Sequence, residues 1–152
     1  MIRMAENLYS VVSEEEPKLY HSESILLATF FGGPLVGGYM TAENFKHMGE
    51  PEKAKQTWVF AFIGISLLVA FMQFVQISKI PWYTLPLVYT ALTYIPMKWM
   101  QGRKIQSHLM AGGLLHKGDR VFVVGFVGAV ATYLVMLIAN MFLQAATTGV
   151  VS

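Results

Sequence analysis

Side chains that could do chemistry are few in this sequence, and they form no recognised catalytic pattern. The histidines are His21, His47, His108 and His116, and their spacing matches no HExxH-type metal site. Cysteine is absent, which excludes disulfides, thiolate nucleophiles and thiolate metal sites. Hydrolytic and phosphoryl-transfer sites need a nucleophile with a base, paired carboxylates, or a metal with its ligands. We therefore expect no enzymatic activity, no cofactor and no bound metal.

The glycine-rich stretch TFFGGPLVGGYMT, residues 29–41, points to packing instead of chemistry. It contains neither GxGxxG nor the Walker lysine, so phosphate binding has no support, and nucleic-acid binding has none either. In a single helix, its small residues would recur at i+4 positions and let another helix approach closely. We predict a helix-packing face made of Thr29, Gly33, Gly37 and Thr41.

The composition is that of a membrane protein. Of the 152 residues, 55% are hydrophobic and 13% charged, against about 25% charged in soluble domains. The mean hydropathy is +0.49. In water, each interior glycine of a helix costs about 1 kcal/mol and a proline about 3 kcal/mol. In lipid the backbone must bond internally, so a segment such as 29–41 can still be helical.

Four apolar segments each approach the roughly 20 residues that cross a bilayer. The second and third are separated by residues 78–80 alone, so they must be antiparallel neighbours. We predict an all-α polytopic membrane bundle of four transmembrane helices in two antiparallel hairpins, with a Gly/Pro-rich first helix that is open to being broken. The predicted spans are 24–42, 57–77, 81–100 and 121–145.

The first segment has a second interpretation. Its GGPLVGG core could form a re-entrant loop, which a membrane tolerates where protein or a water-filled cavity covers the backbone. Three spans would then remain, with the acidic N-terminal tail on the cytoplasmic side. Residues 1–23 form this tail, as either a short amphipathic helix or a frayed segment, and residues 146–152 form a C-terminal tail.

Basic residues gather on one side of the four-span arrangement. The positive-inside rule places that side, with the loops 43–56 and 101–120, in the cytoplasm and both termini outside. The basic residues of this side are Lys46, Lys53, Lys55, Lys98, Arg103, Lys104, Lys117 and Arg120, against Arg3, Lys18 and Lys79 on the other.

The cytoplasmic loops offer a second group of candidates. Residues 98–110 can continue the third helix beyond the lipid, and the glycine pair after them suits a helix end that needs a positive φ. Glu43 and Asn44 would lie at the depth of Lys98 or Arg103, which favours a structural salt bridge over an ion gate. The basic loop is either a docking surface for a partner or anionic lipid, or a simple helical extension. The residues singled out are Glu43, Asn44, Arg103, Lys104, His108, Gly112 and Gly113.

Uncharged amides lie late in the second and fourth spans, at similar depth near the outer side. They can hydrogen-bond between helices, for about 0.6 to 2 kcal/mol each, or line a hydrated vestibule. No Asp, Glu, Lys, Arg or His lies in the interior of a predicted span, since Lys98 lies at the end of the third one, and this argues against a proton-coupled pump. This outer-side cluster consists of Gln73, Gln76, Asn140 and Gln144.

Two motifs in the chain resemble a family of small bacterial multi-pass membrane proteins. The first reads GGPLxGGYxxAxNF, the second reads QGxxIxxHLxxGG, and the similarity covers most of residues 28–113. The resemblance implies a bacterial cytoplasmic membrane and a helical bundle, and it brings no activity with it. The matching positions are Gly33, Pro34, Gly37, Gly38, Asn44, Phe45, Gln101, Gly102, His108, Gly112 and Gly113.

Two classes of function remain. A non-catalytic accessory or assembly subunit would pack its glycine faces and basic loop against larger membrane proteins, with ten methionines as adaptable packing groups. A small channel or transporter, completed by oligomerisation, would use the amide cluster and a broken first span as its path. We expect the lipid bilayer and either a membrane-protein partner or a second copy as partners, and we favour the accessory subunit.

Overall fold

The computed structural model describes residues 17–74 and 81–148, which are helical apart from connecting segments and one isolated β-bridge. The predicted all-α class is confirmed for these residues. Residues 1–16, Gln76 and 149–152, on which parts of the sequence predictions fall, lie outside the described residues, as does the side chain of Gln73. The helices are α2 (Ser22–Gly32), α3 (Pro34–His47), α4 (Pro51–Phe74), α5 (Thr84–Met110) and α6 (Gly118–Thr148).

The segment predicted as the first span, 24–42, is two helices and not one. Gly33 ends α2 with φ 85° and ψ 178°, a backbone conformation open to glycine and disfavoured for other residues. Pro34 then begins α3 at the first helical position, where its missing N–H costs no hydrogen bond. The predicted i+4 face therefore does not run along a single helix.

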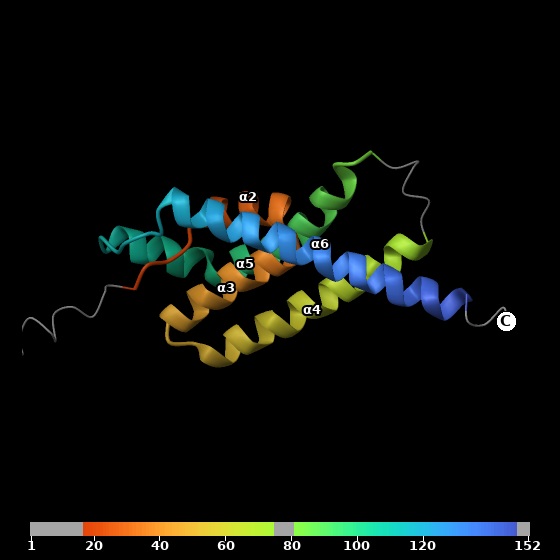
Figure 1. Cartoon of the computed structure of the whole chain (residues 1–152). Coiled ribbons are helices and arrows are strands. Elements are labelled where there is room, and N and C mark those ends of the chain that lie inside the picture. Colours follow the sequence, from red (N-terminus) through yellow and green to blue (C-terminus); the bar gives the residue numbers. More distant parts are fainter. Residues whose placement is uncertain (1–16, 75–80, 149–152) are drawn as a thin grey trace, which may run out of the picture.

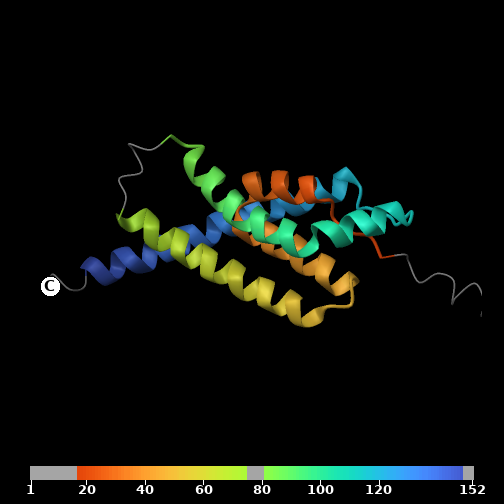
Figure 2. The same ribbon diagram turned by 180° about the vertical axis from the view of Figure 1, so that it is seen from behind.

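The helices α2 and α3 fold back on each other as an antiparallel hairpin (Figures 1 and 2). At its open end, the backbone of Tyr20, before α2, is hydrogen-bonded to the Asn44 side chain near the end of α3. At its tip, the Thr132 hydroxyl of α6 donates to the Gly32 carbonyl at 2.9 Å. The prediction of one continuous helix over residues 24–42 is therefore wrong, because this segment begins and ends at the same end of the bundle.

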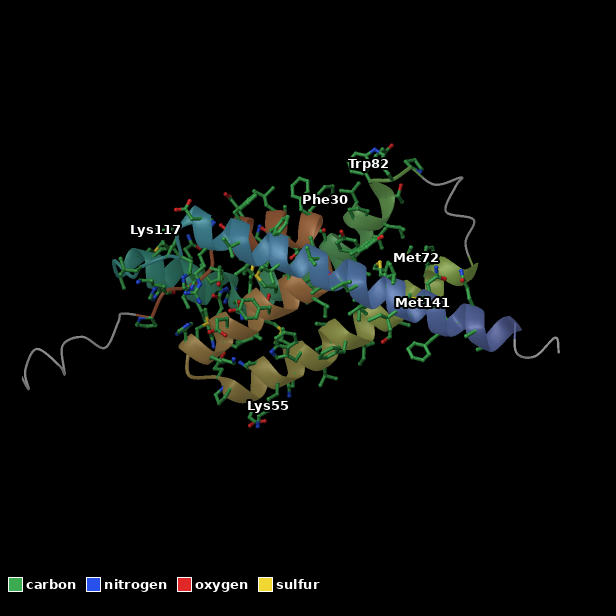
Figure 3. The ribbon with its side chains drawn as sticks, in the orientation of Figure 1. Phe30, Lys55, Met72, Trp82, Lys117 and Met141 are labelled. Carbon is green, nitrogen blue, oxygen red and sulfur yellow. The ribbon has the colours of Figure 1, made fainter. Side chains whose placement is uncertain are left out.

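The open end of the hairpin lies beside the basic loop between α5 and α6. The Leu19 N–H donates to the Leu114 carbonyl at 3.1 Å, and the His116 N–H donates to the Leu19 carbonyl at 3.0 Å. We call this the basic end, where Figure 3 shows Lys117, and the opposite one, where it shows Trp82, the far end. The prediction that the N-terminal tail lies opposite the basic loops is wrong for the segment around Leu19.

The three long helices run alternately between these ends. α4 and α6 run from the basic end to the far end, and α5 returns (Figure 1). Two stretches, Pro51–Met72 and Gly118–Ala146, are long and apolar enough to cross a membrane, and 11% of the most apolar part of each is buried. As predicted, α5 continues to Met110 and is followed by Gly112 with φ 82°.

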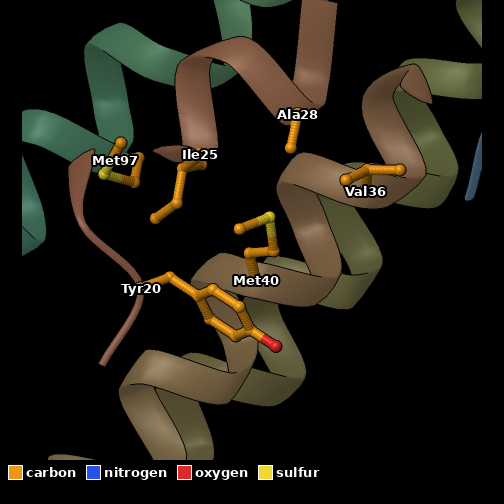
Figure 4. Close-up of a cluster of buried hydrophobic side chains, with 6 residues drawn as sticks. All are labelled: Tyr20, Ile25, Ala28, Val36, Met40 and Met97. Atoms are coloured by element: carbon orange, nitrogen blue, oxygen red, sulfur yellow. The ribbon is translucent and has the colours of Figure 1, made fainter. Parts of the chain in front are cut away.

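The hairpin fills the centre of the bundle. α2 packs mainly against α5 and α6, α3 packs mainly against α4, and the three long helices touch one another little. The long helices are therefore joined through the hairpin. The buried side chains of this contact, shown in Figure 4, are Tyr20, Ile25, Ala28, Val36, Met40 and Met97.

Glycines permit the close approach of the hairpin to its neighbours. A Cβ on Gly37 would lie 2.5 Å from the Thr29 Oγ1 in the other arm and 2.6 Å from the Thr93 Cγ2 in α5. A Cβ on Gly33 would lie 2.8 Å from Thr132 of α6. The residues predicted to pack therefore lie at helix contacts, although they belong to two helices and the turn between them.

We expect Gly37→Ala to destabilise the protein by about 1–3 kcal/mol, the cost of overpacking a filled contact. The matched control is Gly64→Ala in α4, where a Cβ meets nothing within 4 Å. This control should be neutral or stabilising by about 1 kcal/mol, because alanine is the better helix former. Unfolding of the purified protein in detergent measures both, and equal stability of the two variants would contradict the packing described here.

Candidate functional site

The most deeply buried polar side chains of the described residues meet at the basic end, around Asn44. Asn44 Oδ1 accepts from the Tyr20 N–H at 2.7 Å, and Nδ2 donates to the Tyr20 carbonyl at 2.9 Å. Nδ2 also donates to Gln101 Oε1 at 3.4 Å, and Gln101 Nε2 donates to the Thr41 carbonyl at 2.7 Å. Asn44 and Gln101 are both 0% exposed. This amide network ties the two ends of the hairpin to each other and to α5.

The amide network also joins the two sequence motifs. Asn44 belongs to the first motif and Gln101 to the second, 57 residues later. In the second motif, the His108 ring occupies the space that a Cβ on Gly113 would need. The His108 Nε2 lies 3.2 Å from the Leu114 carbonyl, which holds the α5–α6 loop beside Leu19. Residues of both motifs therefore hold the segment around Leu19 and Tyr20: Asn44 bonds it directly, and His108 holds the α5–α6 loop that pairs with it.

Aromatic and cationic side chains cover the amide network. The Arg120 Nε donates to the Tyr20 hydroxyl at 3.1 Å. The Tyr20 ring centroid lies 4.2 Å from that of His116 and 6.5 Å from that of Tyr39. The His47 and His116 centroids lie 6.5 Å apart. We call Tyr20, Tyr39, His47, His116 and Arg120 the tyrosine–histidine cluster.

Burial sets the protonation of this cluster. It raises the pKa of the Tyr20 hydroxyl, which therefore stays protonated at neutral pH. It also lowers the pKa of His116, and the positive charge of Arg120 lowers it further. The buried His116 Nε2 has no hydrogen-bond partner among the described residues. A neutral imidazole that contacts a neutral phenol, with the two rings tilted by 38°, is therefore the form that the fold favours.

One carboxylate links the loop after α3 to α5. Glu50 Oε1 accepts from Lys53 at 3.0 Å and also from Lys104. The hydrogen bonds from Lys104 and Lys53 lower the pKa of Glu50, so it is ionised at neutral pH. Because these side chains are partly exposed, the pairs orient the loop more than they stabilise the fold.

The salt bridge predicted from Glu43 to Lys98 or Arg103 is wrong. Glu43 pairs within its own helix, at 3.3 Å from Lys46 and 3.7 Å from His47. Arg103 and Lys98 instead line a polar groove of about 510 Å³ between the start of α2 and α5. The error arose because depth in a bundle does not fix which side of a helix a residue occupies.

The amides predicted at the far end are not part of the buried network. Asn140 and Gln144 are exposed on α6, and Gln73 belongs to the last turn of α4. The buried amides lie at the basic end instead. A sequence signal for them exists in α3, where Val36, Met40 and Asn44 recur at i+4 and place a polar residue on an apolar stripe.

Sequence reasoning missed the tyrosine–histidine cluster. Tyr20 and Arg120 are separated by 100 residues, and no local pattern marks their contact. The contacts that the structure gives the cluster are the hydrogen bond from Arg120 to Tyr20 and the ring contacts of Tyr20 and His116. Comparison of the chain with family models, with curated proteins and with solved structures finds no match.

We expect Asn44→Leu to be severely destabilising. It leaves the buried N–H and carbonyl of Tyr20 and the Oε1 of Gln101 without their Asn44 partner, and each such group costs about 1–3 kcal/mol. The matched control is Asn140→Leu on the exposed surface of α6, which should have little effect. Unfolding in detergent compares the two, and a stable Asn44→Leu protein would show that the amide network does not hold the hairpin.

Proposed function

We propose that the chain is a multi-pass protein of the bacterial cytoplasmic membrane in which α4, α5 and α6 cross the bilayer and the α2–α3 hairpin is re-entrant. The apolar stretches of α4 and α6 support this placement, because core helices of soluble proteins are mostly buried and these are exposed. If α4 and α6 both cross from the basic end, α5 must cross back to connect them. The proposal revises the four-span prediction to three spans.

The positions of Trp82 and Trp99 support the proposed crossing of the bilayer by α5. Trp82 precedes α5 at the far end and is 78% exposed. Trp99 lies in α5 toward the basic end and is 86% exposed. Their separation along a helix is about 25 Å at 1.5 Å per residue. Tryptophan is enriched at the two interfaces of a hydrocarbon core about 30 Å thick. The two side chains are therefore spaced like the two interfacial belts.

The charge asymmetry supports a cytoplasmic basic end. Beyond α4, residues 75–80 contribute Lys79 alone, and no lysine or arginine follows Arg120 in the sequence. By the positive-inside rule, the basic end faces the cytoplasm and the end of α6 faces outward. Residues 17–21 then lie on the cytoplasmic side. The basic residues near that side are Lys18, Lys46, Lys53, Lys55, Lys98, Arg103, Lys104, Lys117 and Arg120.

The molecular role that we propose is non-catalytic assembly: the protein packs against another membrane protein through the far half of its long helices. One observation carries this proposal. No described side chain of α4 after Ile65, or of α6 from Tyr133 to Phe142, is buried. The hairpin tip at Gly33 lies against Thr132 in the middle of α6, so within residues 17–74 and 81–148 the hairpin does not extend between the helices beyond that point. That space suits a helix from a partner.

A channel completed by oligomerisation has less support. A broken helix serves an ion path when its free carbonyls or N–H groups line a cavity. Here hydroxyls cap the break, because Thr132 donates to the Gly32 carbonyl and Tyr89 donates to the Phe30 carbonyl at 2.7 Å. The tip is thus closed by neighbouring helices and is a packing element.

Site-directed photo-crosslinking tests the assembly role in the cells from which the sequence derives. A photoreactive residue at Ile138, in the far half of α6, should give an adduct of one defined higher mass. The same residue at Phe122, exposed in the basic half of α6, should give lipid adducts. An adduct of twice the monomer mass would support the oligomeric alternative. Lipid adducts alone from Ile138 would contradict the assembly role.

A further inference from the structure

An apolar groove runs between α3, α4 and α6 from the basic end toward the middle of the bundle. Its volume is about 380 Å³. At its floor α3 lies close to α6, where Gly128 leaves room for the Val36 side chain. Trp58 of α4 and Tyr39 of α3 stand at the basic end of the groove, with their ring centroids 6.4 Å apart. The lining residues are Leu35, Val36, Tyr39, Trp58, Phe62, Val123, Val124, Val127, Gly128 and Ala131.

The tyrosine–histidine cluster stands at the head of this groove. Arg120 lies one helical turn before Val123 and Val124, which line the groove, and its side chain interacts with Tyr39 as well as Tyr20. The Arg120 Nε is occupied by the Tyr20 hydroxyl. A guanidinium has five N–H donors, so Arg120 keeps N–H groups for an anion beside its contacts with Tyr20 and Tyr39.

The local charge at the groove head is positive. Lys18 and Arg120 are both close enough to His116 to act on its charge. The nearby acid Glu43 forms an ion pair with Lys46 on its own helix. A basic group above an apolar groove at the cytoplasmic interface complements a phosphate joined to a hydrocarbon chain.

We propose that this groove binds an acyl chain of an anionic glycerophospholipid, with the lipid phosphate at Arg120. A transmembrane helix of a partner is a poorer fit. An apolar helix carries no anionic group that could pair with Arg120 at the groove head, whereas the phosphate of an anionic phospholipid can. The site goes beyond the assembly role, since it lies in the basic half of the bundle and not in the far half, although it does require that the chain lies in a membrane.

Fluorescence quenching of Trp58 by brominated lipids tests the site. The full chain with Trp82→Phe and Trp99→Phe has Trp58 as its one tryptophan, because the sequence contains three. It is reconstituted in phosphatidylcholine that contains a small, equal fraction of brominated phosphatidylglycerol or brominated phosphatidylcholine. We expect phosphatidylglycerol to quench Trp58 with a preference of about tenfold, as expected for one charge-assisted contact.

Two pairs of variants locate the preference. Arg120→Gln should abolish it, whereas Lys117→Gln, a neighbouring exposed charge that does not line the groove, should keep most of it. Because Arg120→Gln also removes a bond to Tyr20, a second pair leaves the cluster intact. Val127→Phe fills the groove and should abolish the preference, and Val130→Phe, which lies outside the lining, should keep it.

The outcomes separate this inference from the proposed function. Equal quenching by the two brominated lipids, or a preference that survives both Arg120→Gln and Val127→Phe, overturns the lipid site. Absence of quenching by either lipid also overturns it, since another occupant then covers the groove. A parallel protein that keeps Trp99 alone reports membrane placement: quenching of Trp99 upholds that placement whatever Trp58 shows, and its absence counts against the membrane proposal itself.

Discussion

The fold depends on a single buried amide that closes a hairpin. Asn44 bonds both backbone groups of Tyr20 and the side chain of Gln101, so it fixes the start of α2, the end of α3 and the middle of α5 at one point. Without this closure, two short helices joined at Gly33 would have little reason to lie antiparallel. With it, they become the core around which three long helices pack.

The proposed re-entrant placement requires that the backbone at the hairpin tip, far from water, finds hydrogen-bond partners. The α2–α3 hairpin does so with hydroxyls from its neighbours: Tyr89 of α5 donates to the Phe30 carbonyl and Thr132 of α6 donates to the Gly32 carbonyl. The Gly33 N–H donates to the Thr29 carbonyl within the hairpin itself. This arrangement meets the rule that irregular backbone at membrane depth is covered by protein. The glycines therefore serve close packing, and the hydroxyls serve capping.

The helical class, the three long helices and the helix end at Gly112 could be predicted from the sequence, because apolar length and glycine preferences are local properties. It did not allow the choice between a crossing helix and a hairpin for residues 24–42. That choice depends on where Asn44 finds its partners, and these lie 24 and 57 residues away. For the same reason Tyr20 and Arg120 escaped notice, whereas Asn44 carried a local signal as a polar residue on the apolar stripe of α3.

The most direct test of the hairpin is to determine on which side of the membrane each of its two ends lies. The natural chain has no cysteine, so Glu23→Cys at the start of α2 and Lys46→Cys at the end of α3 are single labelling sites, and both positions are exposed. A membrane-impermeant maleimide should label both in inverted vesicles and neither in intact cells with a permeable outer envelope. Labelling of Glu23→Cys from outside and Lys46→Cys from inside would mean that residues 24–42 cross the membrane, and the hairpin account would be wrong.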